Sequence, residues 1–172
     1  MLFRSTFGLP VFRPPPPAGE TARLLHSLDL FPRRAHFIGA YSLGKAQRLI
    51  AMLRQAGYTA PVWVDDATAR LCDVYGQFGV DLGDWRSLRH AGPRDLAGSI
   101  VIAPPSARDR LFADADEEPV TSFASGWMRV RRRALQGGGD LPLIISDHAD
   151  WDELRMTAQE VAPTELWITH GD

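Results

Sequence analysis

Two apolar runs near the carboxyl end decide the fold: Leu141-Pro142-Leu143-Ile144-Ile145-Ser146-Asp147-His148, and then Glu165-Leu166-Trp167-Ile168-Thr169-His170-Gly171. Short runs that are rich in β-branched and aromatic residues are typical of buried strands. Residues 151–161 between them are expected to form a helix. A strand, a helix and a second strand make a βαβ unit, in which the two strands are parallel.

A histidine follows each of these expected strands, His148 after the first and His170 after the second. Parallel strands end at the same edge of a sheet, and that edge is where open α/β sheets bind ligands. We therefore expect both imidazoles at one ligand-binding edge. This placement favours metal binding or acid–base chemistry.

The rest of the chain repeats the alternation of strands and helices. Strands are expected at 2–7, 35–40, 61–64, 99–103 and 120–124, and helices at 19–28, 43–56, 66–78 and 106–113. Residues 81–97 are expected to be irregular, and the prolines at 14–17 form a stiff connector. The pattern predicts an α/β fold with a doubly wound, mostly parallel sheet.

Composition sets limits on the class of protein. The 172 residues suffice for one domain with a core, and 45% hydrophobic with 23% charged residues is ordinary for a globular protein. The net charge of -2 means that any site for a polyanion must be local. The single cysteine excludes an internal disulfide and a cysteine-rich zinc site. Neither a secretory leader nor a membrane-spanning run is recognisable, so we expect a cytoplasmic protein.

Four polar clusters follow expected strands. They are residues 41–45, 125–129, 146–148 and 169–171. If the strands are parallel, all four meet at one edge of the sheet. Ser42 precedes an expected helix and Ser125 precedes a glycine, so backbone N–H groups there can bind a phosphate. Ser42 as a simple helix N-cap is the alternative.

One dense basic patch is present, made of Arg129, Arg131, Arg132 and Arg133. Arginine suits phosphate because its planar guanidinium donates two parallel hydrogen bonds. A solvated helix face is the alternative interpretation. The neighbouring Trp127 favours nucleic acid, since an aromatic ring beside arginine can stack on a base.

The cluster around His148 has both structural and chemical interpretations. Asp150 and Glu153 have the spacing of a capping box for the following helix, and we favour that role for both. His148 lies just outside the cap and has no helical role. Asp147 beside it is a candidate supporting residue. The expected pairing with His170 favours a functional role for His148.

Five segments together resemble a known family. They are residues 5–13 (STFGLPVFR), 39–48 (GAYSLGKAQR), 124–131 (ASGWMRVR), 146–151 (SDHADW) and 167–171 (WITHG). In this order they resemble the β-CASP nucleases of the metallo-β-lactamase fold, and most closely the bacterial ligase-associated DNA exonucleases. The resemblance spans nearly the whole chain.

The resemblance implies roles for particular residues. His148 matches the β-CASP histidine, which contacts the scissile phosphate and is a candidate general acid. His170 matches the histidine that completes the di-zinc site. The segments Ser42–Lys45 and Ser125–Gly126 match segments that line the nucleic-acid groove. The family hydrolyses phosphodiesters with a zinc-bridged hydroxide.

Two features depart from the family. Arg4 stands where the family places the acidic residue that supports the β-CASP histidine, so the resemblance implies that Arg4 lies beside His148. The main metal motif, His-x-His-x-Asp-His, is absent from the sequence. A dinuclear site needs several ligands, and His148 with His170 cannot hold two zinc ions. We therefore expect residues 1–172 to be a single β-CASP-like domain, with the C-terminal strands of a metallo-β-lactamase fold, that is a fragment of a larger protein.

The function expected from the resemblance is the β-CASP portion of a zinc-dependent DNA exonuclease in DNA repair, inactive by itself. Its expected partners are DNA, in single-stranded form, and the DNA ligase and helicase partners of that family, with no membrane. Two alternatives remain open. One is a non-catalytic nucleic-acid-binding module, and the other is a nucleotide or sugar-nucleotide enzyme that holds phosphate at the helix start near Ser42.

Overall fold

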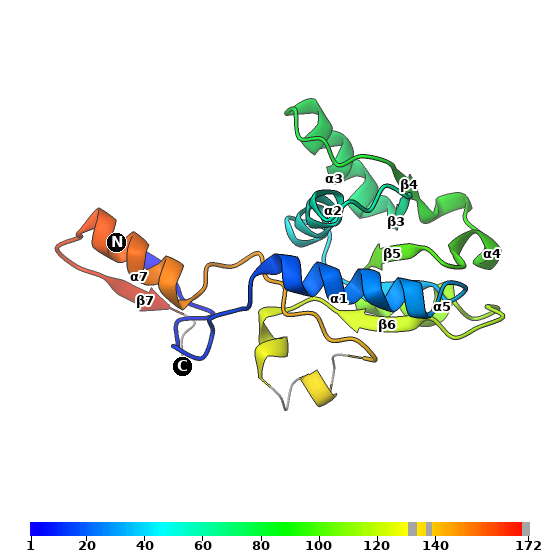
Figure 1. The fold of residues 1–172 in the computed structure, drawn as a ribbon. Coiled ribbons are helices and arrows are strands. Elements are labelled where there is room, and N and C mark those ends of the chain that lie inside the picture. Colours follow the sequence, from blue (N-terminus) through cyan, green and yellow to red (C-terminus); the bar gives the residue numbers. More distant parts are fainter. Residues whose placement is uncertain (131–133, 137–138, 170–172) are drawn as a thin grey trace.

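The centre of the protein is a five-stranded parallel sheet with strand order β4-β3-β5-β2-β6. The computed structural model describes residues 1–130, 134–136 and 139–169. The strands are β2 (His36–Gly39), β3 (Val62–Val64), β4 (Trp85–Ser87), β5 (Ile100–Ala103) and β6 (Val120–Phe123). Helices lie on both sides of this sheet (Figure 1). The prediction of a doubly wound parallel α/β fold is confirmed.

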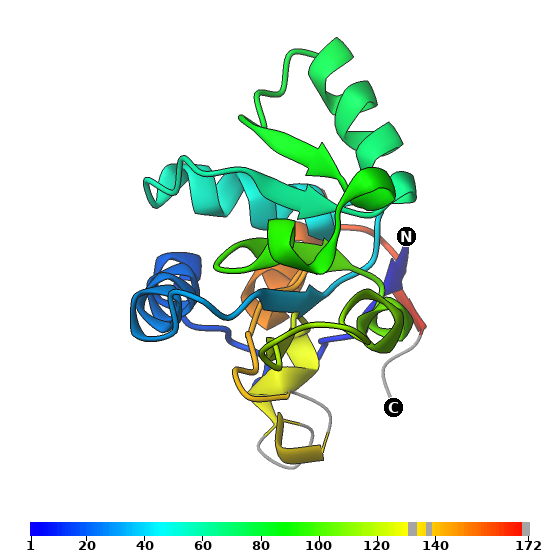
Figure 2. The same ribbon diagram turned by 90° about the vertical axis from the view of Figure 1, so that its right-hand side faces the viewer.

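Three helices cover one face of the sheet: α1 (Pro17–Leu30), α2 (Lys45–Gln55) and α3 (Asp66–Gln77). The opposite face carries only short helices, which are α4 (Pro93–Leu96), η2 (Pro105–Ala107) and α5 (Arg108–Leu111). Figure 2 shows α1 and α5 on opposite sides of β2. The chain therefore has one large core and one smaller one.

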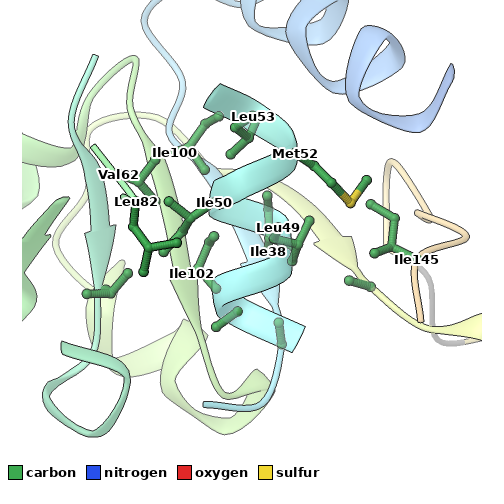
Figure 3. Close-up of a cluster of buried hydrophobic side chains, with 14 of the residues drawn as sticks. Ile38, Leu49, Ile50, Met52, Leu53, Val62, Leu82, Ile100, Ile102 and Ile145 are labelled. Atoms are coloured by element: carbon green, nitrogen blue, oxygen red, sulfur yellow. The ribbon is translucent and has the colours of Figure 1, made fainter. Parts of the chain in front are cut away.

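The large core forms between α2 and the central strands. Leu49, Ile50 and Leu53 recur at helical spacing and are fully buried. They pack against Ile38 and the other strand residues shown in Figure 3. On the other side of α2, Met52 and Ile145 belong to the same cluster. The core thus reaches the segment 139–146, which leads into the polar cluster at 146–148.

The prediction that residues 81–97 are irregular is wrong. They contain β4, the 3-10 helix η1 (Leu88–His90) and α4. β4 pairs in parallel with β3 at the edge of the sheet. Its sequence, Trp-Arg-Ser, is too short and too polar to show a strand pattern, so the exposed hydrogen-bonding groups of β3 determine the pairing.

The predicted βαβ unit is also wrong. Its helix exists as α7 (Trp151–Val161), but residues 141–145 form only one parallel bridge, from Leu143 to Ala124. The second run forms β7 (Trp167–Thr169), which pairs with β1 (Leu2–Arg4) in a separate two-stranded parallel sheet. Figure 1 shows this pair beside α7, away from the main sheet. The two runs therefore do not end at one edge of one sheet, and His170 lies outside the described residues.

In the part of the chain that the structure describes, no helix combines the length and the apolar character that crossing a bilayer requires.

One buried histidine gives the fold a pH dependence. The ring of His36 is inaccessible to solvent; its Nε2 lies 2.9 Å from Ser27 Oγ and its Nδ1 lies 3.2 Å from the Arg34 carbonyl oxygen. Burial lowers the pKa of His36 below its ordinary value of 6.5. The unfolded chain therefore binds the proton more readily than the folded chain does, so stability should fall as the pH drops through about 6.5.

We expect the free energy of unfolding to be smaller at about pH 5.5 than at about pH 7.5, and part of this difference should disappear in His36→Gln. Urea denaturation at both pH values measures it. The control is His26→Gln, because His26 is exposed. An equal loss of stability on acidification in wild-type protein and His36→Gln would contradict the assignment.

Candidate functional site

A cavity of about 280 Å³ lies beyond the carboxyl ends of β2 and β6. Its walls come from four parts of the chain. The N-terminal loop supplies Phe7, Phe12 and the four prolines, α2 supplies Arg48, the segment after β6 supplies Gly126 and Arg129, and the segment before α7 supplies Ser146 and His148. The stretch 14–17, predicted as a connector, therefore forms a wall of the cavity, and Pro17 is also the first residue of α1.

An aromatic cluster holds this cavity together. The Phe7 ring centroid lies 4.8 Å from that of Phe12, 5.5 Å from that of Trp127 and 5.7 Å from that of His148. Gly126 lies directly under Phe7, where a Cβ atom would be 2.5 Å from the Phe7 Cζ atom. The glycine of the segment 124–131 is thus required by the close approach of the aromatic ring.

His148 is exposed at the cavity and meets Phe7 edge-on. Its backbone N–H donates to Ser146 Oγ at 3.0 Å. Within the described residues, its imidazole makes no hydrogen bond or ion pair. The predicted capping box is present, because Asp150 Oδ1 accepts from the Glu153 N–H while Glu153 Oε2 accepts from the Asp150 N–H, both at 2.9 Å. The cap fixes the chain just after His148 and leaves the imidazole free for a ligand.

Lys45 and Asp147 form an ion pair with a distance of 3.4 Å between Nζ and Oδ1. The Lys45 side chain is only 11% exposed, and that of Asp147 is 29% exposed. Asp147 therefore supports the neighbouring His148 by joining its loop to α2. The Lys45 ammonium thus has a counter-charge within the protein, and its contact with nucleic acid stays a prediction.

The start of α2 also differs from the prediction. Its N-cap is Gly44, with φ of 79°, and not Ser42. A Cβ atom at Gly44 would lie 3.5 Å from Asp147 Oδ2. The positive end of the helix thus faces a carboxylate of the protein itself, where the sequence suggested a bound phosphate.

Removal of the Asp147 charge should destabilise the protein. In Asp147→Asn the buried ammonium of Lys45 loses its counter-charge, and we expect the free energy of unfolding to fall by about 1–3 kcal/mol. The double variant Lys45→Met/Asp147→Asn should recover most of this loss, because no charge remains buried. Urea denaturation measures both.

A matched control for Asp147→Asn is Asp109→Asn. The Asp109 side chain is 91% exposed in its ion pair with Arg108, so its loss should change stability by less than about 1 kcal/mol. Equal effects of the two substitutions would show that the Lys45 pair does not anchor the loop.

The basic patch is described only in part. Arg129 is exposed and lines the cavity, whereas Arg131, Arg132 and Arg133 lie outside the described residues. Trp127 is 40% exposed. Ser125 is buried, and its Oγ accepts the Trp127 N–H at 3.3 Å, so it caps the 3-10 helix η3 (Gly126–Arg129).

The N-terminal loop is fastened to α7 by two contacts. Arg13 pairs with Asp152 at 2.7 Å, and the Trp151 N–H donates to the Phe12 carbonyl oxygen at 3.2 Å. The hydrogen bond from Arg13 holds the pKa of Asp152 below its ordinary value. Phe7 and Phe12 were not predicted as site residues, although both fall within the segment 5–13. Arg48 was likewise missed, although it ends the segment 39–48.

The residues at the ends of β1 and β7 bear on the family resemblance. Arg4 is exposed and lies opposite Thr169 in the register of the small sheet. Within the described residues its side chain has no hydrogen bond or ion pair, so its expected position beside His148 has no support from a contact. The Ser5 N–H donates to the Thr169 carbonyl oxygen at 2.9 Å. The end of β7 is thus attached to the loop that supplies Phe7.

The described residues do not fit a zinc centre. Among them, no group of three or more His, Cys, Asp or Glu side chains is placed to hold a metal ion. Asp147, the carboxylate beside His148 in the sequence, is paired with Lys45. His170 lies outside the described residues. The cavity combines the exposed side chains of Arg48, Arg129 and His148 with the carboxylates of Asp150 and Glu153 and the buried rings of Phe7 and Phe12.

A comparison with known protein families finds no match. Among curated proteins, one from Opitutus terrae named probable DNA ligase is 29% identical over 177 residues. The chain is similar along its whole length to part of that protein. The match covers 99% of this chain and 16% of the relative, so the chain spans about a sixth of the relative's length.

Proposed function

We propose that this chain is the nucleic-acid-binding, β-CASP-like part of a zinc-dependent, ligase-associated DNA exonuclease. The observation that carries the proposal is the meeting of four family-like segments at one cavity. Residues from 5–13, 39–48, 124–131 and 146–151 all line it, although more than a hundred residues separate the first segment from the last. Segments far apart in the sequence thus contribute to one cavity, which is what a shared nucleic-acid site requires.

The charges around the cavity suit a phosphate backbone. Arg48, Arg129 and His148 are exposed there. Asp150 and Glu153 also line the cavity, and each accepts a backbone N–H of the α7 cap. Among the described residues, neither carboxylate forms an ion pair with Arg48 or Arg129. In the proposed complex the arginines bind phosphates of the strand.

Two further observations support a larger assembly. The relative is named a DNA ligase, and most of its length lies outside the match. Leu2, Trp167 and Ile168 of the β1–β7 pair are 68%, 65% and 61% exposed, although parallel sheets are normally covered on both faces. We propose that a metal-binding part covers this sheet and supplies the zinc ligands that this sequence lacks, and that the complete protein acts with DNA ligase and helicase partners.

A non-catalytic nucleic-acid-binding module is the second candidate, because the described residues do not fit a zinc centre. It predicts the same binding but no hydrolysis in any assembly. The nucleotide-enzyme alternative loses its main support, since Asp147 lies at the start of α2 where a phosphate was expected.

Binding of single-stranded DNA tests the proposal. We expect weak affinity that decreases with salt. Arg129→Ala should reduce the slope of log affinity against log salt by about 0.7. A variant with alanine at Arg129, Arg131, Arg132 and Arg133 together should reduce the slope further. Fluorescence anisotropy of a labelled oligonucleotide measures the slope.

The matched control is Arg110→Ala, because Arg110 is exposed on α5 and does not line the cavity. An affinity that does not depend on salt would overturn the assignment of the site. Equal changes in affinity in Arg129→Ala and Arg110→Ala would overturn it as well.

A further inference from the structure

A second groove, of about 470 Å³, lies along the carboxyl-terminal half of α1, near the amino-terminal end of β6. Its walls include three basic residues, which are Arg23, His26 and Arg34. The one carboxylate among its lining residues belongs to Asp140, and its Oδ2 accepts the Thr121 N–H at 2.8 Å. The lining therefore carries two guanidinium groups, one imidazole and one carboxylate, in a chain whose net charge is negative.

The groove and the cavity share the same two walls. One wall is α1, which contributes Pro17 to the cavity and Arg23 to the groove. The other is the segment 139–146, which contributes Ile144 to the cavity and Leu141 to the groove. α1 has 14 residues, so its length is about 21 Å. Figure 1 shows the orange segment before α7 passing α1, to which hydrogen bonds join it.

Two contacts fasten the shared walls together between the cavity and the groove. The Ile144 N–H donates to Glu20 Oε2 at 2.7 Å, and Arg23 Nη1 donates to the Pro142 carbonyl oxygen at 3.3 Å. Glu20 is buried, whereas the Arg23 side chain is 47% exposed. Arg23 also forms an ion pair with Glu20, with 3.0 Å between Nη1 and Oε2, and is the exposed member of that pair. Hydrogen bonds thus hold the floor between the two sites, and the charged group that reaches solvent there is a guanidinium.

The far end of the groove combines a cation with apolar surface. Phe31 is 42% exposed, and the Arg34 guanidinium lies 5.2 Å from its ring centroid. Hydrogen bonds from Arg34 to the carbonyl oxygens of Glu118 and Pro119, at 2.7 and 3.2 Å, fix that guanidinium in place. Basic grooves with aromatic side chains are what proteins use to bind single strands without sequence preference.

We propose that a single DNA strand bound at the cavity continues along α1 into this groove, which provides a second set of contacts to the same strand. The proposal rests on the proposed function, because it assigns the path of the strand beyond the cavity. In this proposal His26, Arg23 and Phe31 contact the strand, although none of the three lies in the family-like segments.

Oligothymidylates of about 4 and about 12 nucleotides, within the range of known single-strand site sizes, test the path. Leu30 lines the groove, is 59% exposed and lies outside the core cluster, so its replacement should leave the fold intact. Leu30→Lys should tighten binding of the longer oligonucleotide and increase its salt slope by about 0.7. Leu30→Glu should weaken binding of the longer oligonucleotide. Neither substitution should change binding of the shorter oligonucleotide.

The matched controls are Gln77→Lys and Gln77→Glu, at an exposed position on α3 that lines neither site. Equal effects at positions 30 and 77, or an effect of Leu30→Lys on both oligonucleotides, would overturn the path while the proposed function stands. Failure of wild-type protein to bind either oligonucleotide would overturn both.

Discussion

Gly126→Ala is expected to abolish measurable binding of single-stranded DNA and to lower the free energy of unfolding by about 1–3 kcal/mol. The new methyl carbon would lie 2.5 Å from Phe7 Cζ and 2.6 Å from Phe7 Cε2. The ring cannot move away easily, because Phe7 is 4% exposed and lies between Phe12 and Trp127. A displaced Phe7 would also displace His148, whose ring it contacts.

Urea denaturation and fluorescence anisotropy measure the two effects of Gly126→Ala. The matched control is Gly76→Ala in α3, where a Cβ atom would meet nothing within 4 Å. That substitution should stabilise the helix by up to about 1 kcal/mol and leave DNA binding unchanged. Wild-type stability and wild-type affinity in Gly126→Ala would show that the aromatic cluster does not shape the binding site.

No release of nucleotides from labelled DNA is expected when the purified chain is incubated with zinc or manganese. The described residues include no cluster that could ligate a metal ion, and a dinuclear centre needs more ligands than His148 and His170 supply. Metal-dependent digestion by the 172-residue chain, lost in His170→Ala, would show that the site has been assigned to the wrong residues.

Digestion is expected once a metal-binding part that carries His-x-His-x-Asp-His is supplied, either fused to the chain or as a separate protein. In that assembly His148→Ala should lower the rate by about 10²–10⁴-fold, which is the usual contribution of a general acid. The matched control is Gln77→Ala, at an exposed position on α3 that lines neither the cavity nor the groove along α1. Binding without digestion in the restored assembly would favour the non-catalytic module.

Much of the fold could be predicted because it depends on neighbouring residues. Leu49, Ile50 and Leu53 mark the buried face of α2 through helical spacing alone. The apolar runs of β2, β5 and β6 lie within the predicted ranges. The cap formed by Asp150 and Glu153 was predictable too, since its two hydrogen bonds join residues three positions apart.

The parts of the site that could not be predicted depend on contacts between distant residues. The partner of Lys45 is Asp147, and Gly126 makes room for Phe7. A lysine that follows a glycine at a helix start has the same local pattern whether its charge meets a phosphate or a carboxylate. The sequence therefore identified Lys45 as a charged residue at a helix start but could not show that Asp147 is its partner.

The sequence by itself determined the type of most elements and the cap of α7. Only the tertiary structure decided that β7 pairs with β1 outside the main sheet, and that residues 141–145 form a single bridge to the end of β6. The physical reason is that hydrophobic periodicity reports which faces are apolar, whereas a strand's backbone groups can pair with any available strand. The choice of partner is therefore set by the packing of the whole chain.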